Sequence, residues 1–432
     1  MNMYTVEQLL SKIDAGEYDK AFVCLYGSDS VSVQRKRYKH AVNCFGDLFG
    51  REREAILFSA PGRTEIGGNH TDHNHGCVLA ASVNLDVIAV ASPSADDIIR
   101  VHSEGFTPDT VLLNDLSMVD SQKGHSSSLI RGMADRFIQN GYKIGGFDAF
   151  TTSNVLKGSG LSSSAAFEVL IGTILNCLFN KNAADAVEIA KMAQYSENVH
   201  FGKPSGLMDQ MASSVGGIIT IDFADPQNPI IRKVNYDFAD SGYHLCIVDT
   251  GGNHADLTPE YSAVTVEMKA VSNSLGVNYL RETSMDKLMS KIAELREQHG
   301  DRAVLRSIHF MRDNQRVARQ VEALESGDFE EFKMLIIESG HSSFEYLQNV
   351  YAACNVAEQG LSLALCIAQG MLGGGLGAWR VHGGGFAGTT QNFVPTALLD
   401  SFRSSMESVF GKGSCHVLNI RPVGGICLDM LM

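Results

Sequence analysis

A stretch rich in glycine and serine at residues 157–168 has the composition of a loop that binds phosphate. It reads Lys-Gly-Ser-Gly-Leu-Ser-Ser-Ser-Ala-Ala-Phe-Glu, and an apolar, helix-prone run follows it to Leu178. Glycines let the backbone approach a ligand closely, and a helix start offers free N–H groups and the positive end of the helix dipole. Taken alone, the stretch is equally compatible with a helix N-cap after a flexible turn. It is not the Walker pattern, because no Gly-Lys-Ser/Thr closes it.

A second polar stretch at residues 62–74 reads Gly-Arg-Thr-Glu-Ile-Gly-Gly-Asn-His-Thr-Asp-His-Asn. We expect a loop between two strands that surrounds a small polar ligand with directional hydrogen bonds, with Arg63 as its fixed cation. His70, His73 and His75 with Asp72 also suggest a transition-metal site, but no second ligand cluster in the sequence supports it. A solvated polar loop is the other alternative.

Glu197 and the segment 206–210, Gly-Leu-Met-Asp-Gln, place carboxylates beside a glycine and a methionine. We expect Asp209 to be partly buried. Burial raises the pKa of a carboxyl group, whereas a nearby arginine lowers it. That combination suits a general base, or a group that stabilises a hydroxyl nucleophile. The alternative is an aspartate that caps the following helix.

Residues 382–388, His-Gly-Gly-Gly-Phe-Ala-Gly, satisfy G-x-G-x-x-G formally. A dinucleotide site needs a strand before this pattern and a long helix after it, and the residues that follow look like a strand. The segment therefore predicts a glycine turn between two strands.

The composition indicates a globular chain with an ample core. Of the 432 residues, 44% are hydrophobic and 19% charged, and the net charge of −14 argues against a nucleic-acid partner. The nine cysteines are scattered singly, which favours a reducing compartment. The first residues lack the features of a signal peptide, and the longest uncharged run, residues 361–379, looks like a buried helix followed by a loop. We therefore expect a cytoplasmic monomer without a membrane partner.

The elements that must position these motifs can be placed from the hydrophobic pattern. Residues 1–35 predict a small helical preface, and residues 225–229 are the best candidate for a passage between two halves. Further helices are expected at 35–49, 126–140 and 183–200 and through most of 264–335. Strands are expected at 55–60, 78–92, 97–103, 110–113, 147–154, 217–222 and 244–249, and the last part alternates strand and helix.

Four motifs in this order resemble those of the GHMP small-molecule kinases, most closely the members that phosphorylate galactose. Residues 62–74 look like the signature Gly-Arg-x-Asn-Leu-Ile-Gly-Glu-His-Thr-Asp-Tyr-Asn, and residues 157–165 look like the phosphate loop Gly-x-Gly-Leu-Ser-Ser-Ser-Ala. Residues 206–210 match Gly-Ile/Leu-Met-Asp-Gln, and residues 377–388 resemble the third motif, which ends in Thr-Gly-Gly-Gly-Phe-Gly-Gly. The resemblance runs from about Arg37 to the C-terminus.

The resemblance implies an α+β, two-domain GHMP kinase fold with the active site in the cleft between the domains. We expect an N-terminal helical extension at residues 1–36, an N-terminal kinase domain with the phosphate loop at 37–228, and a C-terminal kinase domain at 229–432. The implied reaction is phosphorylation of the anomeric hydroxyl of galactose by ATP with Mg²⁺. Phosphoryl transfer requires mainly that the protein position the reactants and neutralise developing charge.

The same resemblance implies roles for individual residues. Asp209 acts on the anomeric hydroxyl as base or positioner, and Arg63 keeps Asp209 ionised and steadies the transferring group. Ser164 and Glu197 hold Mg²⁺. The residues expected to wrap the ATP phosphates are Gly158, Ser159, Gly160, Leu161, Ser162, Ser163, Ser164 and Ala165. Those expected to contact the sugar are Asn69, His70, Asp72, Gly206 and Tyr261.

Departures from the family motifs leave the sugar open. Asn69 stands where the signature has a glutamate that contacts the sugar near C6, His73 replaces a tyrosine, and His382 and Ala387 replace a threonine and a glycine. The alternatives are a kinase for galacturonate or N-acetylgalactosamine and a non-catalytic sugar sensor on the same fold, although the intact serine run and Asp209 speak against a sensor. A dinucleotide-dependent oxidoreductase would rest on the glycine turn alone.

Overall fold

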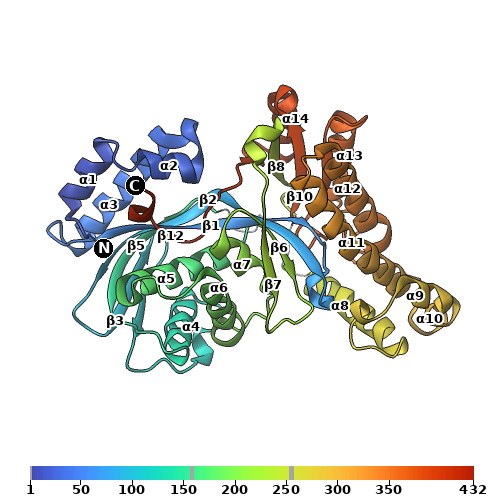
Figure 1. Ribbon diagram of the computed structural model, residues 1–432, viewed down its shortest axis with the longest axis horizontal. Coiled ribbons are helices and arrows are strands. Elements are labelled where there is room, and N and C mark those ends of the chain that lie inside the picture. Colours follow the sequence, from blue (N-terminus) through green and yellow to red (C-terminus); the bar gives the residue numbers. More distant parts are fainter. Residues whose placement is uncertain (1, 156–159, 253–256) are drawn as a thin grey trace.

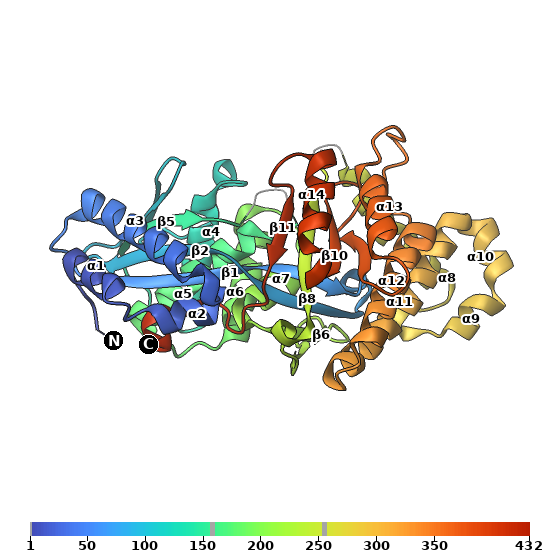
Figure 2. The same cartoon turned by 90° about the horizontal axis from the view of Figure 1, so that it is seen from above.

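The computed structural model describes residues 2–155, 160–252 and 257–432. Within them the chain forms a larger sheet of eight strands and a smaller sheet of four, with helices packed on both. The molecule is elongated. The larger sheet lies at one end, the smaller sheet stands near the middle, and a group of helices forms the other end (Figures 1 and 2). The α+β class predicted from the sequence is confirmed.

The larger sheet has the strand order β12-β1-β2-β5-β3-β4, and β6 extends it by pairing with the beginning of β2 and with β7. Neighbouring strands are antiparallel, except that β3 and β5 are parallel. Its strands are β1 (Ile56–Gly67), β2 (Cys77–Pro93), β3 (Ile98–Ser103), β4 (Asp109–Leu112), β5 (Phe147–Ser153), β6 (Ile218–Asp222), β7 (Ile230–Val234) and β12 (Ile426–Cys427).

β1 and β2 form a long central hairpin that carries the second polar stretch. The sequence predicted a loop from Gly62 onward, but this is wrong, since β1 continues to Gly67. The register between the strands shifts between Pro61 and Arg63 and again before Gly67. Such bulges accommodate proline and glycine within a strand and redirect side chains. The connection between the two strands is therefore limited to residues 68–76, which we call the sugar loop.

Helices cover both faces of the larger sheet, because alternate side chains of its strands point to opposite sides. Leu57, Ile88 and Val90 pack against the N-terminal helices, whereas Phe58 and Ala89 pack into the main core with the helices of the other face. Figure 1 shows α1–α3 on one side of the sheet and α4–α7 on the other. These helices are α1 (Val6–Asp14), α2 (Asp19–Tyr26), α3 (Val31–Phe49), α4 (Ser126–Gln139), α5 (Ser163–Asn180), α6 (Ala186–Tyr195) and α7 (Met208–Val215).

α5 is the central helix of this half. Among the described residues it is the one helix long and apolar enough to cross a membrane by length and composition. Most of it is buried, and it contacts β1, β2, α4, α6 and α7. Packing in the core accounts for its apolar character.

The N-terminal helices that the sequence predicted are fastened to the sheet by buried charges. Arg37 of α3 and Arg421 both pair with the buried carboxylate of Asp86, at 2.6 and 3.2 Å. The hydroxyl of Tyr18 donates to Asp429 near the C-terminus, at 2.9 Å. The two chain ends accordingly lie on the same end of the molecule (Figure 1).

The smaller sheet has the order β11-β8-β10-β9, all antiparallel. Residues Cys246 and Val248 of β8 pack with α13 and α14, and the alternating Leu245 and Ile247 face the main core. The remaining elements are β8 (Tyr243–Asp249), α8 (Thr258–Ser274), α9 (Met285–Ser290), α10 (Ile292–His299), α11 (Asp301–Glu325), α12 (Phe329–Ser342), α13 (Gly360–Leu372), β9 (Ala378–His382), β10 (Thr389–Pro395), α14 (Leu399–Phe410) and β11 (Cys415–Leu418).

Residues 225–229, expected to connect the two halves, form the turn of the β6–β7 hairpin. The predicted domain boundary after residue 228 falls within this hairpin, so the chain leaves the larger sheet only after Val234. The C-terminal β12 then returns to the larger sheet beside β1. Backbone pairing, which a local composition signal does not report, decides where the halves separate.

Candidate functional site

The described part of the phosphate-loop motif leads directly into α5. Gly160 and Ser162 both adopt positive φ, at 68° and 55°, and Ser163 begins the helix. Ser163, Ser164 and Ala165 form the first turn of α5, where backbone N–H groups have no acceptor within the helix. An anion placed at this end is favoured by those donors and by the helix dipole. The other predicted phosphate-binding residues Gly158 and Ser159 lie outside the described residues.

β1 approaches this loop through its backbone. The N–H of Arg63 donates to the carbonyl of Leu161 at 3.1 Å, and a Cβ added to Gly62 would lie 2.7 Å from the same oxygen. Only glycine permits this approach at residue 62. The contact holds the phosphate loop against the strand that carries Arg63.

Arg63 and Asp209 form an ion pair at the start of α5. Nε and Nη2 of Arg63 both lie 2.6 Å from Oδ1 of Asp209, and the hydroxyl of Ser162 donates to Oδ2. Nη1 of Arg63 donates to the carbonyl of Gly160. The Arg63 side chain is 9% exposed and that of Asp209 is 27% exposed. The carboxylate therefore faces open space with a buried guanidinium behind it.

The ionisation of Asp209 follows from these contacts. Burial alone would raise the pKa of the Asp209 carboxyl, but the charge and hydrogen bonds of Arg63 and the hydroxyl of Ser162 outweigh burial, and the pKa lies below its ordinary value. Asp209 is therefore ionised at neutral pH. It orients a hydroxyl group by accepting its hydrogen bond, and it is a weak base because its pKa is low.

Glu197 lies in the helical turn after α6, beside the first turn of α5. Its Oε1 accepts from Ser164 Oγ and from Lys203 Nζ, each at 3.1 Å, and its Oε2 accepts from Gln210 Nε2 at 2.7 Å. The same nitrogen of Gln210 donates to Glu168 at 3.2 Å. Burial and the neighbouring charge of Glu197 raise the pKa of Glu168 well above its ordinary value, which favours its neutral form.

The oxygen atoms of Ser164 and Glu197 suit Mg²⁺, a hard cation that takes few protein ligands and keeps several waters. Oε1 of Glu168, nearby, is buried without a hydrogen-bond partner in the described structure. Within residues 2–155, 160–252 and 257–432, no three His, Cys, Asp or Glu side chains are grouped to hold a metal. The transition-metal interpretation of the histidines in the sugar loop thus has no ligand set.

Asp72 and His70 of the sugar loop each contact a different motif, Asp72 the segment that leads into α7 and His70 the third motif. A Cβ added to Gly206 would lie 2.7 Å from Oδ2 of Asp72, so the absence of a side chain at residue 206 leaves room for that carboxylate. Nε2 of His70 lies 2.8 Å from the carbonyl of Gly384, in the third motif. Burial lowers the pKa of His70 to about 4, so the ring is neutral and donates this hydrogen bond. The fold thus brings three distant motifs together.

Asn69 is completely buried, and protein groups occupy every hydrogen-bonding position of its amide. Nδ2 donates to Glu65 Oε1 at 3.0 Å and to the carbonyl of Gly383 at 2.7 Å. Oδ1 accepts from Ser343 Oγ at 3.2 Å and from Asn349 Nδ2 at 2.8 Å. A primary amide has two donors and two lone pairs. The predicted contact with a sugar hydroxyl would require Asn69 to leave these partners.

Glu65 is a buried partner of Asn69 that the sequence reasoning missed. Nη2 of Arg380 lies 2.6 Å from Glu65 Oε1, and burial nevertheless raises the pKa of Glu65 to about 7. The signature has asparagine at the position of Glu65 and glutamate at that of Asn69. This chain carries the two residue types in reverse order, and they touch. That reversal was the feature of the sequence from which the contact between residues 65 and 69 could have been predicted.

The third motif forms the turn between β9 and β10, as the sequence predicted, with Thr389 paired to His382. No helix follows the turn directly, so the dinucleotide interpretation fails on structure as well. The hydroxyl of Tyr261 donates to the carbonyl of Gly385 at 2.8 Å, and burial raises the pKa of Tyr261 to about 12. Tyr261, predicted to bind the sugar, contacts the glycine turn in this structure.

His382, which replaces the threonine of the family motif, lies under the phosphate loop. Its Nε2 is 3.0 Å from Thr64 Oγ1 and its Nδ1 is 2.9 Å from Thr389 Oγ1. A Cβ added to Gly160 would lie 3.3 Å from Nδ1. Burial and the charges of nearby arginines hold the pKa of His382 far below its ordinary value, so the ring is neutral.

A cavity of about 570 Å³ adjoins the first turn of α5. Ser163, Ser164 and Phe167 line one side of it, and Phe106 and Phe201 contribute aromatic rings. Its size and its mixed polar and aromatic lining suit a nucleotide-sized ligand. Another part of the lining, including Phe106 and His125, comes from the segments after β3 and before α4, which no motif in the sequence marked.

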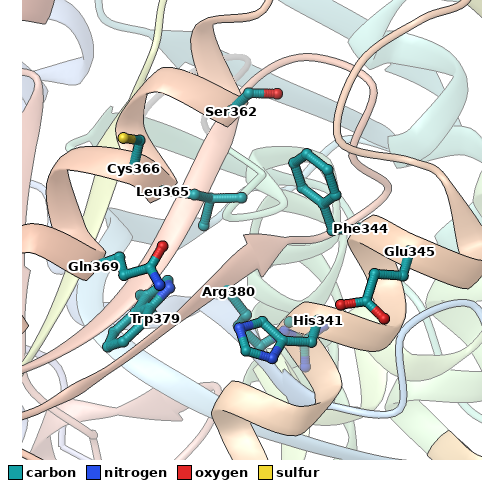
Figure 3. A pocket seen from close by; sticks show the side chains of 10 residues that line it. His341, Phe344, Glu345, Ser362, Leu365, Cys366, Gln369, Trp379 and Arg380 are labelled. Carbon is teal, nitrogen blue, oxygen red and sulfur yellow. The ribbon is translucent and has the colours of Figure 1, made fainter. Parts of the chain in front are cut away.

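A separate cavity of about 300 Å³ lies among α12, the helical turn that follows it, α13 and β9 (Figure 3). Its lining includes the apolar side chains of Phe344, Leu365 and Trp379 and polar ones such as Glu345 and Gln369. None of the predicted site residues lines it. Arg380 lines this cavity and also pairs with Glu65. The cavity is therefore not the candidate active site, although it adjoins a residue that supports the site.

The arrangement is that of the GHMP kinases. The chain matches the family model for the GHMP kinase N-terminal domain over residues 128–217. A galactokinase from Lactococcus lactis, solved in complex with galactose, shares the fold with a TM-score of 0.76 at 24% identity, over 89% of this chain and 98% of that one. The mevalonate kinase of Methanococcus jannaschii gives a TM-score of 0.61 at 14% identity, over 85% of this chain and 98% of that one.

Comparison with individual sequences and with a more specific family model identifies the family within the GHMP kinases. The model described as the galactokinase galactose-binding signature matches residues 43–93, which include the sugar loop. The galactokinase of Streptomyces coelicolor is 30% identical over 366 residues, covering 85% of this chain and 91% of the relative, and that of Clostridium beijerinckii is 30% identical over 376 residues, covering 85% and 92%. The chain belongs to the galactokinase family, which confirms the resemblance seen in the four motifs.

Proposed function

We propose that this chain transfers the γ-phosphoryl group of ATP to the anomeric hydroxyl of galactose. The observation that carries the proposal is the cluster of Arg63, Asp209 and Ser162 between the start of α5 and the sugar loop. The names of the relatives and the galactose in the Lactococcus lactis structure support galactose as the acceptor. The first turn of α5 and the adjoining cavity support ATP as the donor.

In this proposal Asp209 aligns the anomeric hydroxyl for attack. Its lowered pKa means that it accepts the hydrogen bond of the hydroxyl throughout the neutral range, and takes the proton fully only as the transferring bond forms. Arg63 holds the carboxylate in place and contributes positive charge where negative charge develops. The backbone N–H groups of Ser163 and Ser164 donate hydrogen bonds to phosphate oxygens of ATP. Positioning and charge account for most of the catalysis that phosphoryl transfer requires.

The proposed metal role falls to Ser164 and Glu197, whose oxygens would hold Mg²⁺, a source of neutralising charge for the phosphate oxygens. Lys203 shares Glu197 with Ser164 and lies at the same end of α5. Gln210 fixes the other carboxylate oxygen of Glu197, which limits the orientations that Glu197 adopts.

The environment of Asn69 weakens the case for a modified sugar. That alternative rested on loss of the signature glutamate, yet the amide of Asn69 is enclosed by protein and presents no group to a C6 substituent. A sugar sensor is likewise less favoured, because Asp209, Arg63 and the described serines are arranged for transfer. Cytoplasmic location and a monomeric state stay predictions.

The test is ATP consumption measured over a panel of galactose, galacturonate, N-acetylgalactosamine and glucose, with Mg²⁺ present. Galactose should give the highest kcat/KM, and the product should carry phosphate on C1. Asp209→Asn serves as the control for contaminating kinases. Preference for another sugar in the panel would reject the substrate, whereas absence of sugar-dependent ATP consumption would reject the kinase.

A further inference from the structure

The sugar loop belongs to the β1–β2 hairpin of the larger sheet, yet a helix of the other half holds it. In Figure 1 the end of this hairpin reaches across the molecule to α8 and α11. α11 (Asp301–Glu325) contacts both strands. Side chains of α11 form hydrogen bonds with the main chain at both ends of the sugar loop.

At the first end, two side chains of α11 hold the main chain of residue 69. The carboxylate of Asp313 accepts the N–H of Asn69 at 2.8 Å, and Nε2 of His309 lies 2.9 Å from the carbonyl of Asn69. Residues 309 and 313 are four apart, so they share one helix face. Both side chains are fully buried, so water does not replace these bonds.

The hydrogen bonds of His309 define its form. Burial lowers the pKa of His309, so the ring is neutral. A neutral imidazole has one donor and one acceptor. Nδ1 lies 2.8 Å from Ser342 Oγ and accepts from it, which leaves Nε2–H to donate to the carbonyl of Asn69. Asp313 is held in turn by Arg316.

At the second end, Oδ1 of Asn314 accepts the N–H of Cys77 at 2.7 Å. A Cβ added to Gly76 would lie 2.9 Å from the same oxygen, so the helix approaches the loop closely there. Between the two ends, His70 and His75 both adopt left-handed φ, at 58° and 62°. Such conformations are costly for residues with a side chain and persist when surrounding contacts enforce them.

We propose that His309, Asp313 and Asn314 are positioning residues for the sugar. By fixing the peptide groups of residues 69 and 77, they set the conformation in which His70 and Asp72 face the acceptor. The inference rests on the proposed function, because it assumes that the loop binds the acceptor sugar. It assigns the task to side chains that do not themselves touch the sugar.

The experiment compares variants of His309 that differ in hydrogen bonding more than in size. His309→Gln retains an N–H donor toward the carbonyl of residue 69, and His309→Leu does not. Loss of a buried hydrogen bond should raise the galactose KM of His309→Leu about tenfold. Its KM for ATP should change less than about twofold, and His309→Gln should recover most of the galactose KM. Asp313→Asn, which keeps an acceptor, should resemble His309→Gln.

Val321→Ala, also buried in α11 but about two helical turns beyond Asp313, is the control for a general loss of stability. If His309→Leu and His309→Gln have the same galactose KM, or if the KM for ATP rises in the same proportion, the inference is overturned. Calorimetric titration of the wild type with galactose distinguishes failure of this inference from failure of the proposed function. A wild type that neither binds nor phosphorylates galactose overturns the function, and the inference with it.

Discussion

Replacement of Asn69 by the glutamate of the family signature should harm this protein. The change removes both donors of the Asn69 amide, so the carbonyl of Gly383 loses its side-chain donor and Oε1 of Glu65 keeps only Arg380. It also brings a second carboxylate to within about 3 Å of Glu65, the distance now spanned by a hydrogen bond. A buried group left unsatisfied costs about 1–3 kcal/mol. One such group, with the added like charge beside Glu65, predicts that Asn69→Glu loses at least about 1–3 kcal/mol of stability.

The reciprocal change should harm it as well. Glu65→Asn removes the partner of the buried Arg380 guanidinium, and breaking a buried ion pair costs about 3–5 kcal/mol. In the double variant, an amide at residue 65 donates to a carboxylate at residue 69. The two changes should therefore compensate in part, with a coupling free energy of about 1–3 kcal/mol.

The assay is urea unfolding of the wild type, both single variants and the double variant, together with the galactose KM of each. Asn273→Glu, on the exposed side of α8, is the matched control for added charge. We expect Asn69→Glu to raise the galactose KM because the sugar loop shifts. Additive effects of the two single changes would refute the coupling between residues 65 and 69. An Asn69→Glu protein that is as stable as the wild type and has a lower galactose KM would refute the reasoning and indicate that residue 69 contacts the sugar.

The remaining predictions concern catalysis, metal and pH. Asp209→Asn should lower kcat about 10²- to 10⁴-fold while calorimetry still detects galactose binding; a near-normal kcat would remove Asp209 from the mechanism. Ser164→Ala and Glu197→Gln should each raise the Mg²⁺ concentration needed for half-maximal turnover, and an unchanged requirement would place the ion elsewhere. Gly206→Ala should raise the galactose KM by displacing Asp72, whereas the KM for ATP stays the same. Glu65 ordinarily has a pKa of 4.5 and has one of about 7 in the folded protein. The folded state therefore binds the extra proton between these pH values, and stability falls as pH rises through that window. The Tm advantage of the wild type over Glu65→Gln should then be larger at pH 5 than at pH 8, and the opposite trend would contradict the shift.

The sequence alone determined the family and most of the elements. Four motifs in order identified the GHMP kinases, since each motif must keep its residue types to approach phosphate or sugar. Hydrophobic periodicity predicted the long helices, and the glycines with the strand-like residues after them predicted the turn at residues 383–388, because these signals are local. Through the resemblance, the sequence also paired Asp209 with Arg63. In the structure, Oδ1 of Asp209 lies 2.6 Å from Nη2 of Arg63.

Only the tertiary structure decided what surrounds the motifs. The continuation of β1 through Pro61, the hairpin at residues 225–229 and the return of β12 depend on strand pairing between distant segments. The partners of Asn69 come from four separate elements, so residue type alone suggested a sugar contact where the fold encloses the amide. The support of the sugar loop by α11 joins residues some 240 positions apart in the chain. Such contacts leave no local pattern, because each side chain satisfies a partner that only folding brings near.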